Sequence, residues 1–446
     1  MSGGFTSGRT SAATWIVLVA LTYGTWQQGA FYRGPFLVVL LLAAVAVAAV
    51  LSDRGARSAV GPLLARLAAV LGAAVALNVA LTPATWSSAA PTMALVLVVL
   101  AGIGVGASAD EAAADRLALG LVVVAAIVAT TAWVGLALHH EPWAIVVQDL
   151  WRGASSLTYA NATATLAGVG LVLGLARLVR RPELLTFLAT LACAVGVLGA
   201  ASRAGWLSAA VGLLVLGRST GFAALARVAV VVGAAAGVAW LGLLPSLDAG
   251  SRAHAGLAVA AALVAAVGGW TALGRGGRRT TLALGAALAL VGVAVLAGSG
   301  PWASRLTLRS DDRGDEWSAA ADEVRDHPLL GTGAGQLELA WTTPDGRALR
   351  AEFVHNEYLE LVATHGALGL AAFAAAGVVL WRRRRPEHDG ALAALAVIGV
   401  HSAFDFVWHV PVIPLAAALL LGLCVRGAPA TPQDGSDHDA RALSRA

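Results

Sequence analysis

Apolar runs long enough to cross a membrane follow one another along almost the whole chain, and they restrict its possible folds more than any other feature. A helix needs about 20 apolar residues to span the ~30 Å hydrocarbon core. The composition agrees, because the chain of 446 residues is 58% hydrophobic and only 13% charged, whereas soluble domains contain about 25% charged residues. The sequence therefore predicts an all-α, polytopic membrane helix bundle with about 12–14 transmembrane helices. The runs begin near residues 13, 35, 61, 91, 116, 160, 183, 204, 222, 253, 280, 358, 390 and 410.

The distribution of arginine predicts how these helices are oriented. All 30 basic residues are arginine, and cytoplasmic loops carry an excess of basic residues. When the N-terminus is placed inside, arginines cluster in every second loop, whereas the short loops between them carry single arginines such as Arg33 and Arg252. We therefore expect both termini in the cytoplasm and the long polar segment 298–356 outside. The arginines of the expected inside loops are Arg54, Arg57, Arg116, Arg177, Arg180, Arg181, Arg218, Arg275, Arg278, Arg279, Arg382, Arg383, Arg384 and Arg385.

This alternation divides the chain into four expected parts. Residues 1–297 form the N-terminal transmembrane helices, and residues 298–356 form one long extracytoplasmic loop that contains short helices and the candidate motifs. Residues 357–427 form the C-terminal transmembrane helices, and residues 428–446 form a disordered cytoplasmic tail. The GTGAG sequence in the loop lacks the Lys-Ser/Thr that completes a P-loop. An ATP-driven pump is therefore not expected. The two cysteines lie in apolar runs, which is typical of buried thiols.

Two arginines stand at expected outer positions where a charge is costly or unusual. Arg203 lies in ASRAGWL at the outer mouth of the eighth span, and ionisable residues at membrane depth usually have a function. The alternative is an arginine that snorkels to the interface beside Trp206. Arg313 begins an expected external helix that lies on the membrane and is capped by Asp311 or Asp312. The apolar residues on one face of that helix are Trp317, Ala321 and Val324.

The end of the long loop contains a glycine turn followed by a capped helix. Glycines at 331, 333 and 335 predict a tight, backbone-exposed turn, for which a structural role is the default interpretation. Asn356 is a good N-cap, so His355 lies just before a helix N-terminus whose N–H groups favour an anion. Gly366 and Gly369 can break the following helix.

Two further polar groups lie at expected outer helix ends. His401, Asp405 and His409 are spaced by four residues, which predicts one helical face. They can ligate a metal, but an intramembrane His–Asp pair packed against neighbouring helices is the favoured interpretation. Arg152 and Asn161, in WRGASSLTYANA, lie at the entry to the sixth span.

The order of these motifs resembles the O-antigen ligase and O-antigen polymerase superfamily, which consists of multi-pass glycosyltransferases of the GT-C class. The similar segments are SRAGW, RGDEW, DHPLLGTGAG, HNEYLEL and THGALGL, preceded by WRGASSLTYANA. They cover about residues 200 to 370, and the N-terminal third is only generically similar. The chain has Gln336-Leu337 where the family usually has Phe or Tyr after the glycine turn, a difference that concerns acceptor contacts.

The resemblance implies a role for each matching residue. Arg203 and Arg313 would bind the pyrophosphate of a polyprenyl-linked glycan donor. His355 would be the catalytic base, or the group that organises the acceptor hydroxyl of a glycan, lipid or protein. The residues with weaker implied roles in substrate binding are Arg152, Asn161 and Asn356.

The chemistry of these side chains is consistent with that reaction. Guanidinium groups match phosphate oxygens in bidentate contacts, and a histidine can accept a proton near neutral pH. If two arginines neutralise the pyrophosphate, no metal is required, so the sequence predicts no metal and no cofactor. Membrane lipids are expected partners and nucleic acids are not.

Other functions remain open at this point. Ligases, polymerases and protein O-oligosaccharyltransferases share these motifs. A flippase or transporter of lipid-linked polysaccharide would distribute polar residues along the spans, whereas here they concentrate at the outer ends. A scaffold whose arginines hold lipid head groups is the third interpretation.

Overall fold

Thirteen of the fourteen expected apolar runs form helices in the part of the chain that the computed structural model describes. The described residues are 8–275, 277, 285, 311–343, 346–385 and 389–427. The expected span that begins near residue 280, the start of the long loop (298–310) and the tail (428–446) lie outside them. Eight of the described helices are long and apolar enough to cross a membrane. The predicted all-α, polytopic helix bundle is therefore confirmed.

The helices in apolar runs begin near the predicted starts of these runs. They are α1 (Gly8–Trp26), α2 (Arg33–Ser52), α3 (Arg54–Leu81), α4 (Trp86–Ser108), α5 (Glu111–Leu138), α6 (Ala160–Arg180), α7 (Leu184–Gly199), α8 (Arg203–Thr220), α9 (Phe222–Leu241), α10 (Ala255–Arg275), α14 (Glu357–Trp381), α15 (Asp389–Ser402) and α16 (Val412–Val425). Helix α6 is buried along nearly its whole length, because α5, α7, α8 and α15 pack around it. Its first turn is therefore fixed from several sides.

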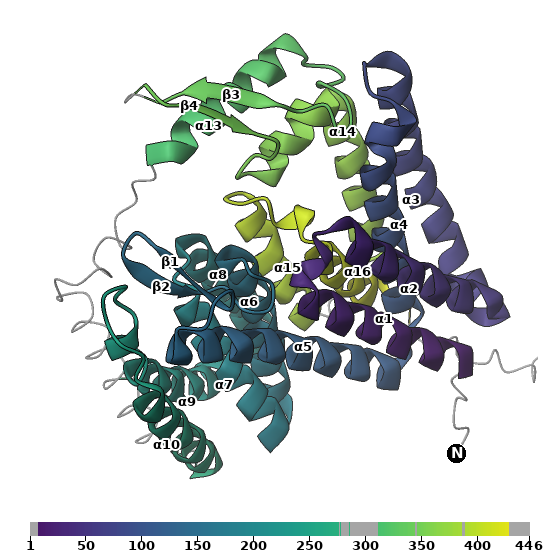
Figure 1. The fold of residues 1–446 in the computed structure, drawn as a ribbon. Helices are drawn as coiled ribbons and strands as arrows, with labels where there is room; N and C mark the ends of the chain where they lie inside the picture. The colour runs from purple at the N-terminus through teal and green to yellow at the C-terminus, as the bar shows by residue number, and fades with distance from the viewer. Residues whose placement is uncertain are drawn as a thin grey trace, which may run out of the picture.

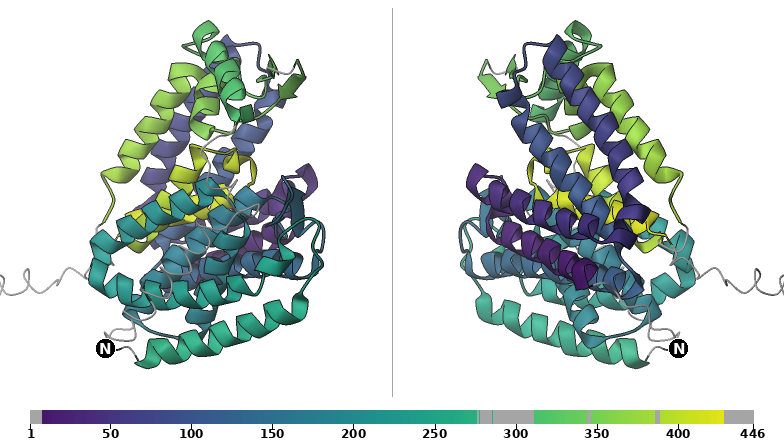
Figure 2. Two further views of the ribbon diagram at one scale, coloured as in Figure 1. Left: turned by 90° about the vertical axis from the view of Figure 1, so that its left-hand side faces the viewer. Right: turned by 90° about the vertical axis from the view of Figure 1, so that its right-hand side faces the viewer.

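Short elements occupy the connections between these helices. Helix α13 (Asp311–Asp326) and the hairpin of β3 (Leu339–Thr342) and β4 (Ala348–Ala351) precede α14, and a second hairpin joins β1 (Ala144–Val147) to β2 (Leu150–Gly153). The 3-10 helices among the described residues are η1 (Gln28–Ala30), η2 (Leu244–Ser246) and η4 (Val407–His409). Figures 1 and 2 show α3, α4 and α14 running up to α13 and the β3–β4 hairpin at one end of the molecule.

Contacts between loops and the neighbouring helix ends fall into two sets among the described residues. The contacts between segments expected outside join Trp151 to Leu247, Arg152 to Ala200, Arg313 to Phe404, Ser88 to Ala334 and Phe31 to Phe353. The contacts between segments expected inside join Arg177 to Asp115, Arg9 to Ser52 and Arg385 to Cys424. The sidedness of the two sets stays a prediction.

One sequence expectation about these helices is wrong. His401, Asp405 and His409 do not share one helical face, because α15 ends at Ser402 and His409 belongs to the separate 3-10 helix η4. The chain turns between the two elements, and Asp405 lies in this turn. The spacing of four residues therefore did not correspond to a helical repeat.

Candidate active site

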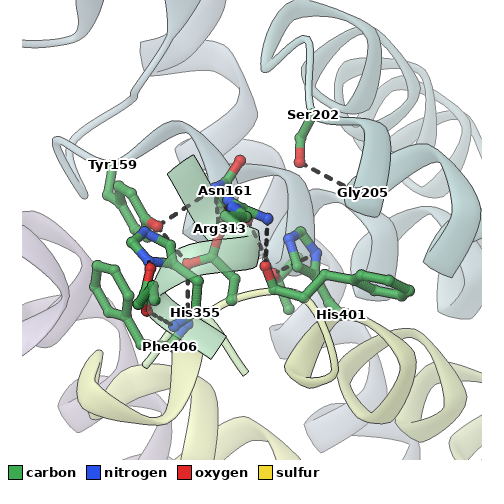
Figure 3. A network of polar contacts seen from close by, with 12 residues as sticks. Tyr159, Asn161, Ser202, Gly205, Arg313, His355, His401 and Phe406 are labelled. Atoms are coloured by element: carbon green, nitrogen blue, oxygen red, sulfur yellow. Dashed lines mark hydrogen bonds and ion pairs between the residues drawn. The ribbon is translucent and has the colours of Figure 1, made fainter. Parts of the chain in front are cut away.

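A network of buried polar contacts centres on Asp405, in the turn between α15 and α16 (Figure 3). Its carboxylate is fully buried and accepts hydrogen bonds from the Tyr159 hydroxyl and the Asn161 amide. Arg313 donates from its Nη2 atom at 3.2 Å. Two chain segments, each more than 80 residues from Asp405, are thereby tied to its buried negative charge, which such partners stabilise.

Tyr159 remains a hydrogen-bond donor in this network. Burial, followed by the negative charge of Asp405, raises the pKa of the Tyr159 hydroxyl well above its ordinary value. The phenol therefore keeps its proton and donates a hydrogen bond to the Asp405 carboxylate. Its ring stacks on Phe406 with centroids 5.2 Å apart.

Arg313 combines internal contacts with partial exposure. The Nη1 atom donates to the Phe404 carbonyl and the Nη2 atom to Asp405, while 29% of the side chain stays exposed. A guanidinium has five N–H donors. These two contacts fix its orientation and leave N–H groups that can bind an anion arriving from the exposed side.

Asn161 and Arg152 extend the network toward α8. The Asn161 side-chain oxygen accepts from Arg152 Nη2 at 3.0 Å, and Arg152 Nε donates to the Ala200 carbonyl at 3.0 Å. Since both ends of the Asn161 amide are engaged and only 9% of the residue is exposed, its contacts join other residues of the network. Arg152 and Asn161, which the sequence placed together at the entry to the sixth span, are thus connected to Arg313 through Asp405.

Arg203 begins α8 next to this network. Ala200, the acceptor for Arg152, lies in the loop directly before α8, and the Ser202 hydroxyl caps the helix by accepting the Gly205 N–H at 3.2 Å. Figure 3 shows the contact between Ser202 and Gly205 in the same view as the network. The side chain of Arg203 is partly exposed. This geometry places Arg203 at a helix N-terminus, where backbone N–H groups already favour an anion.

His355 is paired with a carboxylate that the sequence analysis did not identify. Glu316, on α13, is only 3% exposed, and one of its oxygens lies 2.8 Å from His355 Nδ1. The His355 side chain is 33% exposed, and its ring meets the edge of Phe406 with centroids 4.8 Å apart. One sequence signal could have identified Glu316. It lies three residues after Arg313 in an expected helix, and residues three apart share a helix face.

Asn356 has the predicted capping role. Its side-chain oxygen accepts the backbone N–H groups of Tyr358 and Leu359, each at 3.1 Å. His355 therefore lies directly before the N-terminus of α14, as predicted. The Asn356 side chain caps the start of α14, so His355 is held next to the first turn of this helix.

One group of side chains among the described residues has donor atoms close enough to hold a metal ion. The ligand atoms of Glu357, Glu360 and His409 lie within 4.8 Å of one another. Glu360 is hydrogen-bonded to His409, and Glu357 accepts the Trp408 N–H. Asp311 and Asp312 begin α13, but their side chains are outside the described part of the structure.

The glycine turn is less exposed than expected, and its backbone groups are engaged. The N–H groups of Thr332 and Gly333 donate to carbonyls of α14, and the Ala334 N–H donates to Asn78 of α3 at 2.8 Å. Asn78 also donates to the Leu330 carbonyl at 2.7 Å. The turn therefore joins helices, in agreement with the default structural interpretation.

A comparison with known families gives a match in the second half of the chain. Residues 247–374 match the family described as O-antigen ligase. This segment contains Arg313, Glu316, His355 and Asn356, whereas Arg152, Asn161 and Arg203 lie before it. A search of curated proteins finds no match. The match supports the resemblance to the O-antigen ligase and polymerase superfamily.

Proposed function

We propose that this multi-pass membrane protein of the O-antigen ligase type transfers a glycan from a polyprenyl-pyrophosphate donor to an acceptor hydroxyl. The observation that carries the proposal is the meeting of Arg313 and His355 at the α15–α16 turn. Arg313 contacts Phe404 and Asp405 there, and the His355 ring contacts Phe406. A cationic group and a proton acceptor thus border the same short segment.

The arginines bind and activate the donor. Arg313 is oriented by Asp405, and Arg203 lies at the N-terminus of α8 beside the same network. Guanidinium groups bind phosphate oxygens in pairs, and their positive charge stabilises the pyrophosphate that leaves. Neutralisation by arginine makes the proposed reaction independent of metal ions.

His355 accepts the proton of the attacking hydroxyl. The acceptor oxygen forms a bond to the anomeric carbon while the bond from that carbon to the pyrophosphate oxygen breaks. The electron pair leaves with the polyprenyl pyrophosphate, and the proton moves to the imidazole. A positioned base of this kind contributes about 10²–10⁴-fold to a rate.

The proposed reaction takes place on the outer face of the plasma membrane, with both termini in the cytoplasm. The alternation of arginines supports this orientation, and the site joins only loops from the set expected outside. The glycan, lipid or protein nature of the acceptor distinguishes a ligase from a polymerase or a protein O-oligosaccharyltransferase, and all three use the chemistry described here.

The proposal is tested with His355→Ala in the purified full-length protein in nanodiscs, supplied with a polyprenyl-pyrophosphate-linked glycan and an acceptor. We expect turnover to fall about 10²–10⁴-fold while donor binding is largely retained. His327→Ala is the matched control, because that histidine belongs to the same loop and is 53% exposed. Glycan transfer by His355→Ala at the rate of the unmodified protein would refute the proposed base.

A further inference from the structure

Glu316 contacts His355 through both oxygens of its carboxylate. One oxygen accepts the backbone N–H of His355 at 2.6 Å, and the other lies 2.8 Å from the ring Nδ1 atom. Burying a carboxylate is costly unless its oxygens are hydrogen-bonded. Only 3% of Glu316 is exposed, so the two contacts with His355 provide this compensation.

We propose that Glu316 is a positioning residue, which holds His355 as the tautomer that carries its proton on Nδ1. An ionised carboxylate can only accept hydrogen bonds, so the Nδ1 atom facing it must be the donor. The Nε2 atom then has the lone pair and is the proton acceptor. This inference rests on the proposed function, since it assigns which ring nitrogen acts as the base.

Other contacts hold the same ring and backbone, so the orientation of Nε2 is fixed. The Trp317 indole N–H donates to the His355 carbonyl at 3.2 Å, and Phe406 packs against the imidazole. Within the described part of the chain, Nε2 of His355 makes no hydrogen bond, and a third of the side chain is exposed. The nitrogen needed for proton transfer therefore remains available.

A second Glu–His pair shows what a weaker arrangement looks like. Glu323 lies seven residues after Glu316 on α13, and its nearest oxygen is 4.0 Å from His327 Nε2. Both side chains are substantially exposed, at 33% and 53%. Solvent competes for such a pair, so it fixes neither the tautomer nor the direction of its histidine.

Glu316→Gln tests the proposal, because the amide can keep the backbone contact and yet present an N–H to Nδ1. That contact favours the tautomer with the proton on Nε2, which cannot act as a base. We expect kcat to fall about 10²–10⁴-fold, with the KM for the donor little changed. Glu323→Gln, the matched control, should have unchanged kinetics.

A double variant separates positioning from a general structural effect. If Glu316 acts through the imidazole, adding Glu316→Gln to His355→Ala should cause no further loss of turnover. A multiplicative further loss would overturn the proposal. A fully active Glu316→Gln enzyme beside an inactive His355→Ala enzyme would overturn this inference alone, whereas a fully active His355→Ala enzyme would overturn the proposed function.

The unmodified protein provides a measurement that does not depend on folding of a variant. In protein labelled with ¹⁵N-histidine, the His355 signals are those absent from His355→Ala. We expect the directly bonded proton on Nδ1 in the neutral ring. A neutral ring with its proton on Nε2 would overturn the assignment.

Discussion

The polar segment before α14 contains the glycine turn and the two residues Arg313 and His355, and these differ in what their polar groups contact. In the glycine turn, backbone groups are hydrogen-bonded to α3 and α14, and the Ser88 hydroxyl donates to the Ala334 carbonyl. By contrast, Arg313 and His355 have buried carboxylates as partners yet remain about one third exposed.

This difference separates a structural turn from a site for chemistry. A group whose hydrogen bonds are all made within the fold can orient its neighbours, but it has little to offer a ligand. Arg313 and His355 are oriented by Asp405 and Glu316 and still reach solvent, which is the combination that binding and proton transfer require. Substitutions in the turn and at these two residues should therefore change different measured quantities.

The largest expected effect is a loss of stability in Gly331→Ala. Gly331 has φ +68°, and an added Cβ would lie 2.3 Å from the backbone carbon of Thr364. Gly366, at the kink of α14, would meet Leu329 in the same way, also at 2.3 Å. Left-handed strain alone costs about 1–3 kcal/mol, and a backbone clash adds to this cost. We therefore expect the free energy of unfolding to fall by more than about 3 kcal/mol.

Thermal unfolding of the purified protein measures this effect. Gly346→Ala is the matched control, since Gly346 has φ +86° but no atom of the described residues within 4 Å of the added Cβ. It should show the strain without the clash. Equal unfolding temperatures for the two variants would contradict the idea that the turn and the α14 kink interlock.

A smaller effect, on turnover, is expected for Arg313→Ala. Loss of a preorganised donor to developing charge typically costs about 10²-fold or more, which corresponds to about 2.7 kcal/mol. Arg313→Lys should recover only part, because an ammonium group cannot reproduce the planar guanidinium fork. Arg203→Ala should likewise weaken both donor binding and turnover.

Donor titration and single-turnover rates measure these changes. Arg325→Ala is the control, because Arg325 lies on the same helix, is 74% exposed and pairs only with nearby Asp322 among the described residues. If Arg313→Ala lowered the unfolding temperature and left the rate of the folded fraction unchanged, Arg313 would belong with the glycine turn on the structural side of the comparison.

Much of the fold could be predicted from the sequence because its signals are local. Hydrophobic length predicted the helices, and the identity of Asn356 predicted a cap. Periodicity also predicted α13, although its buried face centres on Glu316 and Ala320, one position from the expected Ala321. The shift arises because Glu316 is buried against His355. A local sequence pattern cannot predict this contact.

The partners of the site residues could not be predicted, since they come from distant parts of the chain. Tyr159 and Asp405 are 246 residues apart, and Asn78 lies 252 residues before the carbonyl it binds. A polar residue in an apolar helix indicates that a partner exists, but the packing of the helices decides which one. His401 and His409 show that regular spacing alone does not predict a shared helical face, because the chain turns between these two residues.

The smallest expected effect is that of chelation, which should leave turnover unchanged. The proposed clamp neutralises the pyrophosphate with Arg203 and Arg313. The carboxylate oxygens of Asp405 already accept hydrogen bonds from Tyr159, Asn161 and Arg313. Transfer is measured after exhaustive treatment with EDTA, before and after Mg²⁺ or Mn²⁺ is added.

The control variant is Glu360→Gln. It and the unmodified protein should respond alike to the chelator, because the contact of Glu360 with His409 needs no ion in this mechanism. Activity that disappears in EDTA and returns with Mg²⁺, but does not return in Glu360→Gln, would replace the arginine clamp with a metal held by Glu357, Glu360 and His409.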